Sequence, residues 1–130
     1  MIIGIGCDIV DHEITKMLQW DSKPDTLKRY FAYKELEIYK KKGGIQFLAG
    51  RFAAKEAVLK ALSTGMYDGI SLTDVQILQL ITGKPLVSLE GKIKQIADDA
   101  GVKRIHVSIS HTTKCSIAYA IAEDGQILEK

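Results

Sequence analysis

A carboxylate and an ammonium group stand four residues apart in a segment that favours helix. Glu56 and Lys60 fall within or beside residues 51–61, which are rich in alanine, leucine and long charged side chains and contain no glycine or proline. Residues four apart lie on one face of a helix. The pair is therefore either an ordinary surface ion pair or, if a second carboxylate faces it, part of a site for a cation or a phosphate.

That second carboxylate could be Asp8, near the end of the apolar run 2–10. The run predicts a buried strand, in which Gly4 and Gly6 allow another backbone to approach closely. A buried charge is costly unless it is paired or bound to a metal. Asp8 therefore either marks the point where the strand reaches the surface or acts as a ligand.

Two further segments carry polar groups suited to binding. Residues 106–113 alternate apolar and polar side chains and end in a cluster of hydroxyls with the His111 imidazole. Gly83-Lys84-Pro85 reads as a turn with a lysine, followed by a strand-like run. Arg51 and Lys55 add positive charge to the helix that carries Glu56.

The elements that must position these residues are mixed in type. The strand and helix patterns do not alternate regularly, and the last two strands form a hairpin around His111, so the fold class is α+β rather than a doubly wound sheet. One domain over residues 1–130 is expected. The sequence predicts strands at 2–10, 71–80, 86–89, 104–110 and 115–122, a break at 21–24, and helices at 25–41 (interrupted near 33), 46–62 and 91–100.

Composition excludes several classes of protein. The chain has 130 residues, 46% hydrophobic and 26% charged, which is typical of a globular domain. A net charge of +2 does not favour nucleic acid, and no apolar run approaches the ~20 residues of a membrane span. The first apolar run follows no basic segment, so we expect no secretory signal. Cys7 and Cys115 match no zinc or redox pattern and are expected to be reduced and buried in a cytoplasmic protein.

Four motifs in order carry a resemblance that spans essentially the whole chain. These motifs resemble the holo-acyl-carrier-protein synthase group of 4′-phosphopantetheinyl transferases, whose fold packs an antiparallel sheet against a long helix. Chains of this length correspond to one unit, and the resemblance implies a homotrimer with active sites at subunit interfaces. The motifs are Gly4–Val10, Arg51–Ala57 with Lys60-Ala61, Gly83-Lys84-Pro85 and Val107–Thr112.

The resemblance implies the reaction. The 4′-phosphopantetheine group of coenzyme A would move to a serine of an acyl carrier protein, leaving adenosine 3′,5′-bisphosphate. Asp8 and Glu56 would hold Mg²⁺, and Lys60 would stabilise charge on the pyrophosphate and the leaving group. The general base stays open between a Mg²⁺-bound water, Glu56 and no strong base at all.

The resemblance also implies which residues bind coenzyme A. Arg51 and His111 would meet the nucleotide phosphates, since a guanidinium gives paired hydrogen bonds to phosphate. Ordinary alternatives exist, because His111 could be a turn residue and Ser110 an end-of-strand hydroxyl. Gly83 and Pro85 would shape the turn near the cofactor. The full set is Arg51, Lys55, Gly83, Lys84, Pro85, Ser110, His111 and Thr112.

The carrier is acidic in this family, so the resemblance implies a basic and apolar docking surface after the Asp8 motif. Residues 11–17 lack the usual arginine; if Asp11-His12 is a short insertion, Lys16 would replace that arginine and Met17 would supply the apolar contact. Lys28 and Arg29 could add charge. Ala32 and Ser63 also depart from the family pattern, which has a hydroxyl and a glycine there. His12 and His106 have no motif support, and His106 is expected to be structural.

Two alternatives within this family remain open. The chain could be a homologue that binds coenzyme A or a carrier without transfer, although intact Asp8, Glu56 and Lys60 argue against it. It could also serve a specialised carrier, whereas short members usually resemble the type that acts in fatty-acid biosynthesis. A different Mg²⁺-dependent phosphotransferase is disfavoured, because no P-loop or kinase motif is present.

Overall fold

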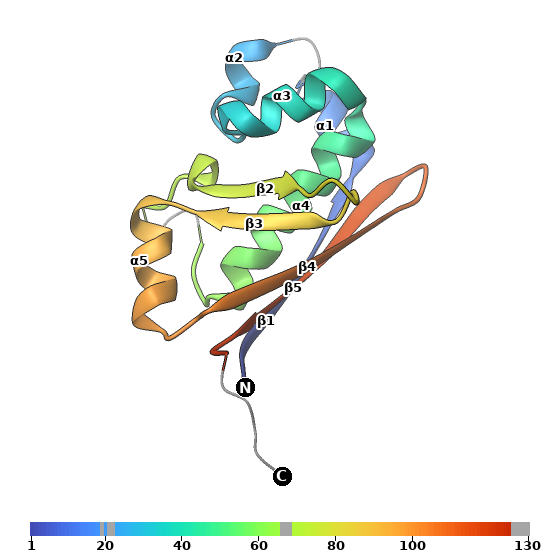
Figure 1. Cartoon of the computed structure of the whole chain (residues 1–130). Helices are drawn as coiled ribbons and strands as arrows, with labels where there is room; N and C mark the ends of the chain where they lie inside the picture. Colours follow the sequence, from blue (N-terminus) through green and yellow to red (C-terminus); the bar gives the residue numbers. More distant parts are fainter. Residues whose placement is uncertain (19, 21–22, 66–68, 126–130) are drawn as a thin grey trace.

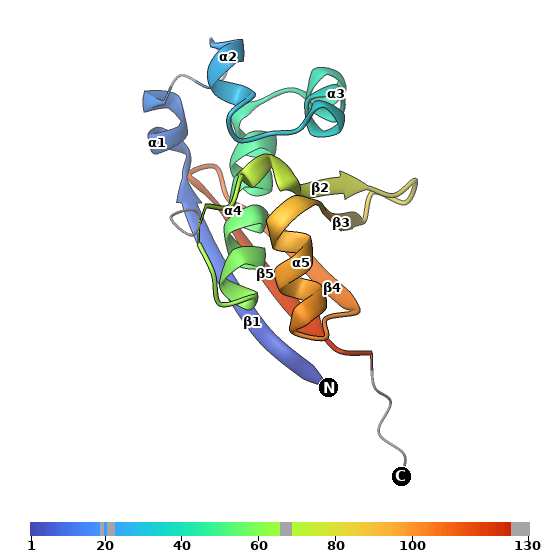
Figure 2. The same cartoon turned by 90° about the vertical axis from the view of Figure 1, so that its left-hand side faces the viewer.

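A long helix packed on a small antiparallel sheet organises the molecule (Figure 1). The structure is a computed structural model that describes residues 1–18, 20, 23–65 and 69–125. Helix α4 (Ile45–Ala61) lies against the three-stranded sheet β1-β5-β4 and also contacts the two-stranded sheet β2-β3. Figure 2 shows α4 between β1 on one side and α5 with the β2–β3 hairpin on the other. The predicted α+β class is confirmed.

The predicted elements are found close to their expected positions. The helix predicted at 25–41 is interrupted as expected, because it forms α2 and α3 with residues 28–32 between them. The strand predicted at 71–80 begins instead with a short 3₁₀ turn, and positions 21 and 22 of the predicted break lie outside the described residues. The remaining elements are β1 (Ile2–Asp11), α1 (His12–Met17), α2 (Pro24–Leu27), α3 (Tyr33–Lys42), η2 (Leu72–Asp74), β2 (Val75–Gln79), β3 (Pro85–Leu89), α5 (Gly91–Asp99), β4 (Arg104–His111) and β5 (Cys115–Glu123).

Two glycines bring β1 directly onto the backbone of α4. A Cβ atom at Gly4 would lie 1.9 Å from the carbonyl oxygen of Ala61, and one at Gly6 would lie 1.8 Å from that of Ala57. No side chain fits at these distances, so the close approach predicted from the two glycines is confirmed. This approach brings Asp8, two residues further along β1, beside the helix that carries Glu56.

The prediction that β1 is buried was wrong for one of its faces. β1 is an edge strand that pairs with β5 alone, and its side chains alternate between α4 and solvent. Ile5 and Ile9 are each 63% exposed, and Cys7 between them is exposed rather than buried. Both cysteines are free, as expected, and Cys115 is half-buried. The outer face of the sheet is therefore apolar without a covering element among the described residues.

The core lies where α4 meets the sheets. Alanines on α4 let the strands approach, and larger side chains from β2, α5 and the helix fill the remaining space. A smaller aromatic cluster joins α4 to the segment around α2, where Trp20 packs on Phe31 and Phe52 at ring distances of 5.7 and 5.2 Å. Both clusters pack against α4. This packing fixes the orientation of the helix and therefore the direction of its polar side chains.

The end of α4 is closed by a backbone motif that normally uses glycine. The Thr64 N–H donates to the Leu59 carbonyl at 2.9 Å and the Ser63 N–H to the Lys60 carbonyl at 3.0 Å, the Schellman pattern. Ser63 takes φ 57°, in the left-handed region where glycine is favoured. Ser63, which stands where the family pattern has glycine, therefore closes the helix in the same way.

No helix of the described ranges is long and apolar enough to cross a membrane.

Candidate functional site

Asp8, Glu56 and Lys60 come together where β1 crosses α4. The Lys60 Nζ donates to Asp8 Oδ1 and to the Cys7 carbonyl, each at 3.0 Å. The Asp8 side chain is 18% exposed and that of Lys60 is 53% exposed, so the group is reachable from solvent. The ion pair of Lys60 is thus with Asp8 across the strand and not with Glu56 one helical turn away.

Lys60 links the two carboxylates, because it bonds to Asp8 and lies one helical turn from Glu56. Partial burial raises the pKa of Glu56, the negative charge of Asp8 raises it further, and Lys60 opposes both effects. The repulsion means that one lysine does not neutralise two acids brought to one place. The cluster therefore has the electrostatic character of a cation site.

The donor set of this cluster fits Mg²⁺. Carboxylate oxygens are hard ligands, and Mg²⁺ is commonly held through one or two carboxylates plus waters and substrate phosphates. Within the described part of the chain, no group of three or more His, Cys, Asp and Glu could hold a metal. The assignment of Asp8 and Glu56 as the metal ligands stays a prediction; with these two protein ligands, most coordination positions would be left for water and phosphate oxygens.

Arg51 lies nearer the start of α4, where its side chain is buried against an aromatic ring. Its guanidinium sits 4.6 Å from the centre of the Phe47 ring, and Nη2 donates to Gln79 Oε1 at 3.2 Å. Its Nε is buried without a hydrogen-bond partner among the described residues. Burial lowers the pKa of Arg51, while the Glu35 carboxylate raises it. A guanidinium with donors to spare suits the expected phosphate contact.

His111 ends β4 and rests on α4 immediately before Arg51. A Cβ atom at Gly50 would lie 2.5 Å from His111 Cε1, so the imidazole fits here because residue 50 has no side chain. The ring Nδ1 lies 2.7 Å from Ser116 Oγ on β5. Burial, with the nearby His12 and Arg51, lowers the pKa of His111. His111 and Arg51 are therefore neighbours, as their expected roles require.

His12 contacts the same serine as His111, although it belongs to none of the sequence motifs. It is buried, and its Nε2 lies 2.8 Å from the same Ser116 hydroxyl that His111 contacts. Pattern reasoning missed the contact because it joins α1 to β5, which are distant in the chain. His106, expected to be structural, contacts Glu123 on the exposed hairpin surface at 2.8 Å, which agrees with that expectation.

The Gly83-Lys84-Pro85 turn connects β2 to β3, as predicted. Gly83 has φ 91°, which requires glycine or strain, and Pro85 begins β3. Gln79 at the end of β2 holds Arg51, so this hairpin is tied to the Arg51 side of α4. Lys84 is exposed at the turn. The role of these three residues toward coenzyme A stays a prediction.

The hydroxyls beside His111 have different surroundings. Thr112 Oγ1 accepts from the backbone N–H groups of Lys114 at 3.1 Å and Cys115 at 3.0 Å, so it holds the β4–β5 turn in shape. Ser110 is exposed on β4 opposite Ile117. Contacts of Ser110 and Thr112 with coenzyme A stay predictions, and the turn-forming use of Thr112 is the one that the structure shows.

The expectation that Lys55 binds coenzyme A was wrong. Its side chain has no exposed area, and its Nζ donates to Glu35 and to the carbonyls of Leu72 at 2.8 Å and Val75 at 2.6 Å. An ammonium group has three donors, and all three are taken inside the protein. Lys55 ties α4 to α3 and to the start of β2, and cannot reach a ligand.

The segment after Asp8 contains the short helix α1, and the two-residue offset at Asp11-His12 stays a prediction. Asp11 caps it by accepting from the Glu13 N–H at 2.9 Å, and His12 and Thr15 face inward. Lys16 and Met17 are exposed, with Met17 at 80%. The residues proposed to meet a carrier are thus on the surface, and Lys28 and Arg29 are exposed as well.

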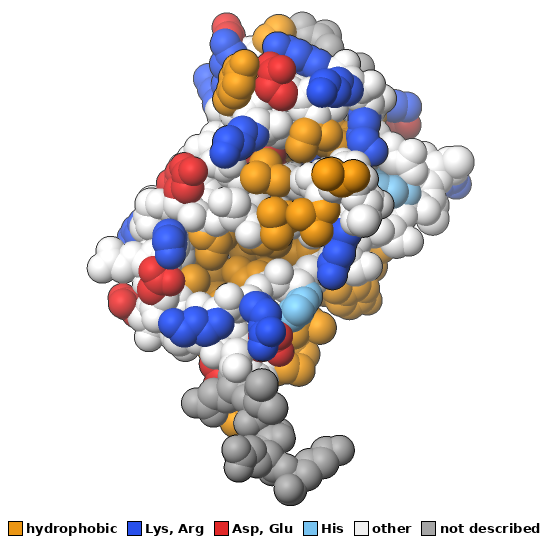
Figure 3. All heavy atoms as spheres, in the orientation of Figure 1, with side chains coloured by type: hydrophobic (Ala, Val, Ile, Leu, Met, Phe, Trp, Pro, Cys, Tyr) orange, Lys and Arg blue, Asp and Glu red, His pale blue; other side chains and the backbone are white. Residues whose placement is uncertain are grey.

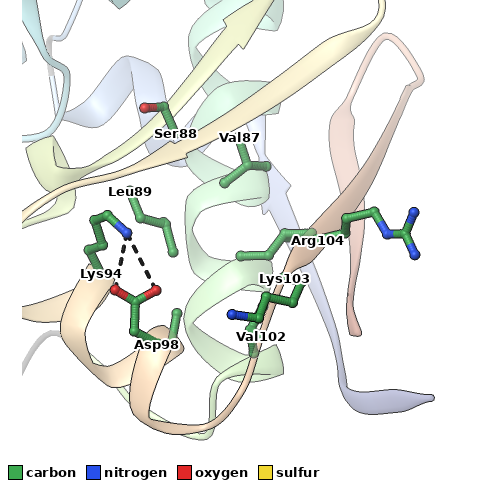
Figure 4. Close-up of a pocket in the computed structure, with 10 residues that line it drawn as sticks. Val87, Ser88, Leu89, Lys94, Asp98, Val102, Lys103 and Arg104 are labelled. Atoms are coloured by element: carbon green, nitrogen blue, oxygen red, sulfur yellow. Dashed lines mark hydrogen bonds and ion pairs between the residues drawn. The ribbon is translucent and has the colours of Figure 1, made fainter. Parts of the chain in front are cut away.

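Some surface hollows are not lined by any of the expected catalytic or coenzyme A-binding residues. Figure 4 shows one between β3, α5 and β4, where Lys94 pairs with Asp98 at 3.1 Å and Lys103 and Arg104 lie nearby. Figure 3 shows hydrophobic side chains along the middle of the face that carries β2 and β3, with Lys and Arg side chains around them. Neither the carboxylate pair nor His111 lines the hollow in Figure 4.

Comparison with known proteins gives a consistent result. The model of the 4′-phosphopantetheinyl transferase superfamily matches residues 4–120. A holo-[acyl-carrier-protein] synthase of Clostridium kluyveri is 43% identical over 129 residues, covering 98% of this chain and 94% of the relative. The crystal structure of the Neisseria meningitidis synthase has a TM-score of 0.85 at 31% identity, covering 95% of this chain and 99% of that one. A Bacillus anthracis synthase in complex with coenzyme A (3′,5′-ADP) has a TM-score of 0.77 at 32% identity, covering 96% and 99%.

Proposed function

We propose that this chain, which belongs to the 4′-phosphopantetheinyl transferase superfamily, is a holo-[acyl-carrier-protein] synthase. It would transfer the 4′-phosphopantetheine group from coenzyme A to a serine of an apo acyl carrier protein. The products would be the holo carrier and adenosine 3′,5′-bisphosphate. The similarity to named synthases over nearly the whole chain supports this activity.

One structural observation carries the proposal: the carboxylates of Asp8 and Glu56 are neighbours, with Lys60 bonded to Asp8 at 3.0 Å. A protein that only bound coenzyme A would have no need of two acids near anionic phosphates, because they would repel them. An enzyme that neutralises phosphate charge with a divalent cation does need them. The non-catalytic alternative is therefore disfavoured by this geometry.

The reaction is a displacement at phosphorus. The serine oxygen of the carrier forms a bond to the phosphorus that bears phosphopantetheine, and the bond from that phosphorus to the leaving bisphosphate breaks. Lys60 is exposed beside the two acids. Its positive charge would stabilise the negative charge of the pyrophosphate as that negative charge moves to the leaving group. Arg51 and His111 would hold the nucleotide phosphates, which fixes the direction of attack.

We propose Mg²⁺ as the metal of this site, held by Asp8 and Glu56. When bound, it supplies Lewis-acid stabilisation of the pyrophosphate oxygens. Asp8 and Glu56 bring the negative charge that attracts the cation, and β1 and α4 fix their separation because the glycine contacts leave no room for adjustment. The general base stays open, since a loose transition state needs little base catalysis.

The proposed activity is tested by intact-mass spectrometry of a purified apo acyl carrier protein incubated with this protein, coenzyme A and Mg²⁺. We expect the mass of the carrier to rise by one phosphopantetheine, and the gain to disappear with EDTA. No gain with several carriers, in the presence of measurable coenzyme A binding, would reject the synthase and leave the non-catalytic homologue. A gain only with carriers of other pathways would support the specialised-carrier alternative.

The proposed carrier surface includes α1. Lys16 and Met17 are exposed there, with Ile14 at 55% exposure as a further apolar side chain. Because the carriers are expected to be acidic, Lys16→Glu should raise the KM for the carrier several-fold and leave the KM for coenzyme A unchanged. An exposed lysine far from α1, Lys94, gives the matched control Lys94→Glu. An unchanged carrier KM would remove Lys16 from the docking surface.

We also propose a homotrimer that uses the outer face of the β1-β5-β4 sheet. Ile5 and Ile9 on β1 and Tyr119 on β5 are each more than half exposed there. Apolar side chains gathered on one face of a sheet favour burial against another subunit. Within the described residues, no hydrogen bond or ion pair joins the Asp8 cluster to Arg51 or His111, so a neighbouring subunit could complete each site. Light scattering on the purified protein should give three times the mass of the chain.

Three finer predictions complete the proposal. The protein is expected to act in the cytoplasm, to serve fatty-acid biosynthesis, and to form a single domain over residues 1–130. The length and the absence of linker composition support the last of these. Rates with purified carriers of different pathways would decide the second.

A further inference from the structure

A buried serine lies between two imidazoles next to the expected phosphate site. Ser116 on β5 has no exposed area, and its Oγ is 2.8 Å from His12 Nε2 and 2.7 Å from His111 Nδ1. The other ring nitrogen of His12, Nδ1, lies 3.1 Å from the Thr113 carbonyl oxygen. Figure 2 shows α1 following β1 at the end of the sheet where the β4–β5 turn lies, and the His12 N–H donates to the Lys114 carbonyl at 2.8 Å.

The proton positions in this row of hydrogen bonds, from His12 through Ser116 to His111, follow from the bond that His12 makes to the Thr113 carbonyl. A carbonyl oxygen only accepts hydrogen bonds, so His12 Nδ1 must carry the proton. In a neutral imidazole the other nitrogen is then an acceptor, and Ser116 must donate its hydroxyl proton to His12 Nε2. The Ser116 oxygen is left to accept, and it can accept from His111 only if His111 carries its proton on Nδ1.

This arrangement decides what His111 offers to a ligand. With the proton on Nδ1, the neutral ring presents a bare Nε2, which is an acceptor. Phosphate oxygens are acceptors too, so a hydrogen bond between them requires one additional proton. The Nε2 edge of the ring lies over Gly50, where a Cβ atom would be 3.3 Å from Nε2, and Arg51 follows next in the chain.

We propose that His12 is a positioning residue which, through Ser116, fixes His111 as its Nδ1–H tautomer and thereby couples the binding of a coenzyme A phosphate to the uptake of one proton. The inference rests on the proposed function for its ligand, and on the contacts among these three side chains for its tautomer. The proton enters at His111 Nε2 and forms the N–H that donates to the phosphate oxygen. No covalent bond between heavy atoms changes.

The surroundings of His111 make this coupling effective. Burial and the positive charge of Arg51 on α4 lower the pKa of His111, and a charge on His12, which faces it from α1, would lower it further. No carboxylate appears among the groups that shift its pKa. The free protein therefore keeps His111 neutral at neutral pH, and the anionic phosphate supplies the negative charge that holds the proton.

The tautomer can be read directly by ¹⁵N NMR of the histidine rings. The chain has 3 histidines, so substituting each one in turn assigns the spectrum. We expect neutral His111 in the wild-type protein to show Nδ1–H. In His12→Phe the Ser116 hydroxyl loses its acceptor and donates to His111 Nδ1 instead, so His111 should change to Nε2–H. Ser116→Ala removes the link and is the second variant if His12→Phe does not fold.

Proton uptake is measured by calorimetry with coenzyme A as the probe, in EDTA, in two buffers that differ in enthalpy of ionisation. At pH 8 the coenzyme A phosphates are ionised, because the second pKa of a phosphate monoester is about 6. Wild-type protein should take up one proton per coenzyme A bound. His12→Phe and Ser116→Ala should take up clearly less, because neutral His111 can then donate from Nε2. His106→Gln, which changes an exposed imidazole on the same hairpin, should match the wild type in both measurements.

The inference and the proposed function fail in different ways. An Nε2–H tautomer in free wild-type protein would overturn the relay whether or not coenzyme A binds. An unchanged tautomer and unchanged proton uptake in both His12→Phe and Ser116→Ala would overturn it as well. Absence of coenzyme A binding by the wild type would instead reject the proposed function, and the coupling to phosphate with it.

Discussion

Two lysines on neighbouring turns of α4 each pair with a carboxylate, but one pair is buried and the other lies near the surface. Lys55 meets Glu35 in the interior, where neither side chain is more than 1% exposed. Lys60 meets Asp8 near the surface, with side chains 53% and 18% exposed. The residue types are the same, so the difference must come from what surrounds them.

The buried pair is complete. The three donors of Lys55 are used by Glu35 and by the carbonyls of Leu72 and Val75, and Glu35 also accepts from the Ala32 N–H at 2.9 Å and the Ile77 N–H at 3.1 Å. The bond to the Ala32 N–H is one half of a capping box at the start of α3, and Ala32 has no hydroxyl to supply the other half. The Asp8 pair is incomplete, because Glu56 adds a second negative charge that Lys60 does not cancel. We call the Lys55–Glu35 pair saturated, because its charges and donors are all matched, and the Lys60–Asp8 pair unsaturated, because Glu56 adds an unmatched charge. The saturated pair stabilises the fold, whereas the unsaturated pair can still bind a ligand.

The largest expected effect comes from breaking the saturated pair. Lys55→Met should lower the free energy of unfolding by about 3–5 kcal/mol, because the Glu35 carboxylate is left buried without its counter-charge. Urea unfolding followed by circular dichroism measures this. The matched control, Lys94→Met, breaks the exposed pair with Asp98 and should change stability by no more than about 0.5 kcal/mol. Equal effects in the two variants would remove the distinction drawn between the pairs.

Breaking the unsaturated pair should affect chemistry and leave the fold intact. Lys60→Ala should lower kcat for transfer by about 10²-fold, the usual loss for a group that stabilises developing charge, with a smaller change in the KM for coenzyme A. Its melting temperature should stay near that of the wild type, since the side chain is exposed. Lys40→Ala, at an exposed lysine on α3, is the control. A raised KM with normal kcat would make Lys60 a binding residue instead.

The smallest expected effect concerns stability against pH. The pKa of Glu56 is raised in the folded state, so folding favours its protonated form. This contribution is complete below the unfolded pKa of about 4.3 and is lost as pH rises through the folded pKa. In EDTA, Glu56→Gln should therefore gain stability relative to the wild type between acid and neutral pH, by no more than about 1 kcal/mol. Thermal melts across this range measure the difference; a loss at neutral pH would mean that Glu56 stabilises the fold.

Local pattern was enough to predict most of the fold, whereas the pairing of Asp8 with Glu56 came from the family resemblance. The apolar run with Gly4 and Gly6 predicted a strand that another backbone approaches closely, and the spacing of Glu56 and Lys60 predicted a shared helix face. Pattern could not show that Lys55 points inward, because neighbouring positions on a helix differ by about 100° and the choice depends on Glu35 in another helix. The exposed face of β1 depends on the order of the strands in the sheet, and the contact of His12 with Ser116 depends on how a distant strand packs. Local sequence specifies neither of these.

The assignment of Asp8 and Glu56 as the metal ligands is tested most directly by the rate of carrier modification as a function of Mg²⁺ concentration, for wild-type protein and Glu56→Gln. The wild-type rate should rise and saturate with Mg²⁺. Glu56→Gln should fold normally, and its rate should be lower by about 10³-fold, the equivalent of several kcal/mol of lost charge stabilisation. Glu37→Gln, at a surface carboxylate paired with Lys40 at 3.2 Å, should behave as the wild type. A wild-type rate and Mg²⁺ dependence in Glu56→Gln would contradict the assignment of this cluster as the catalytic metal site.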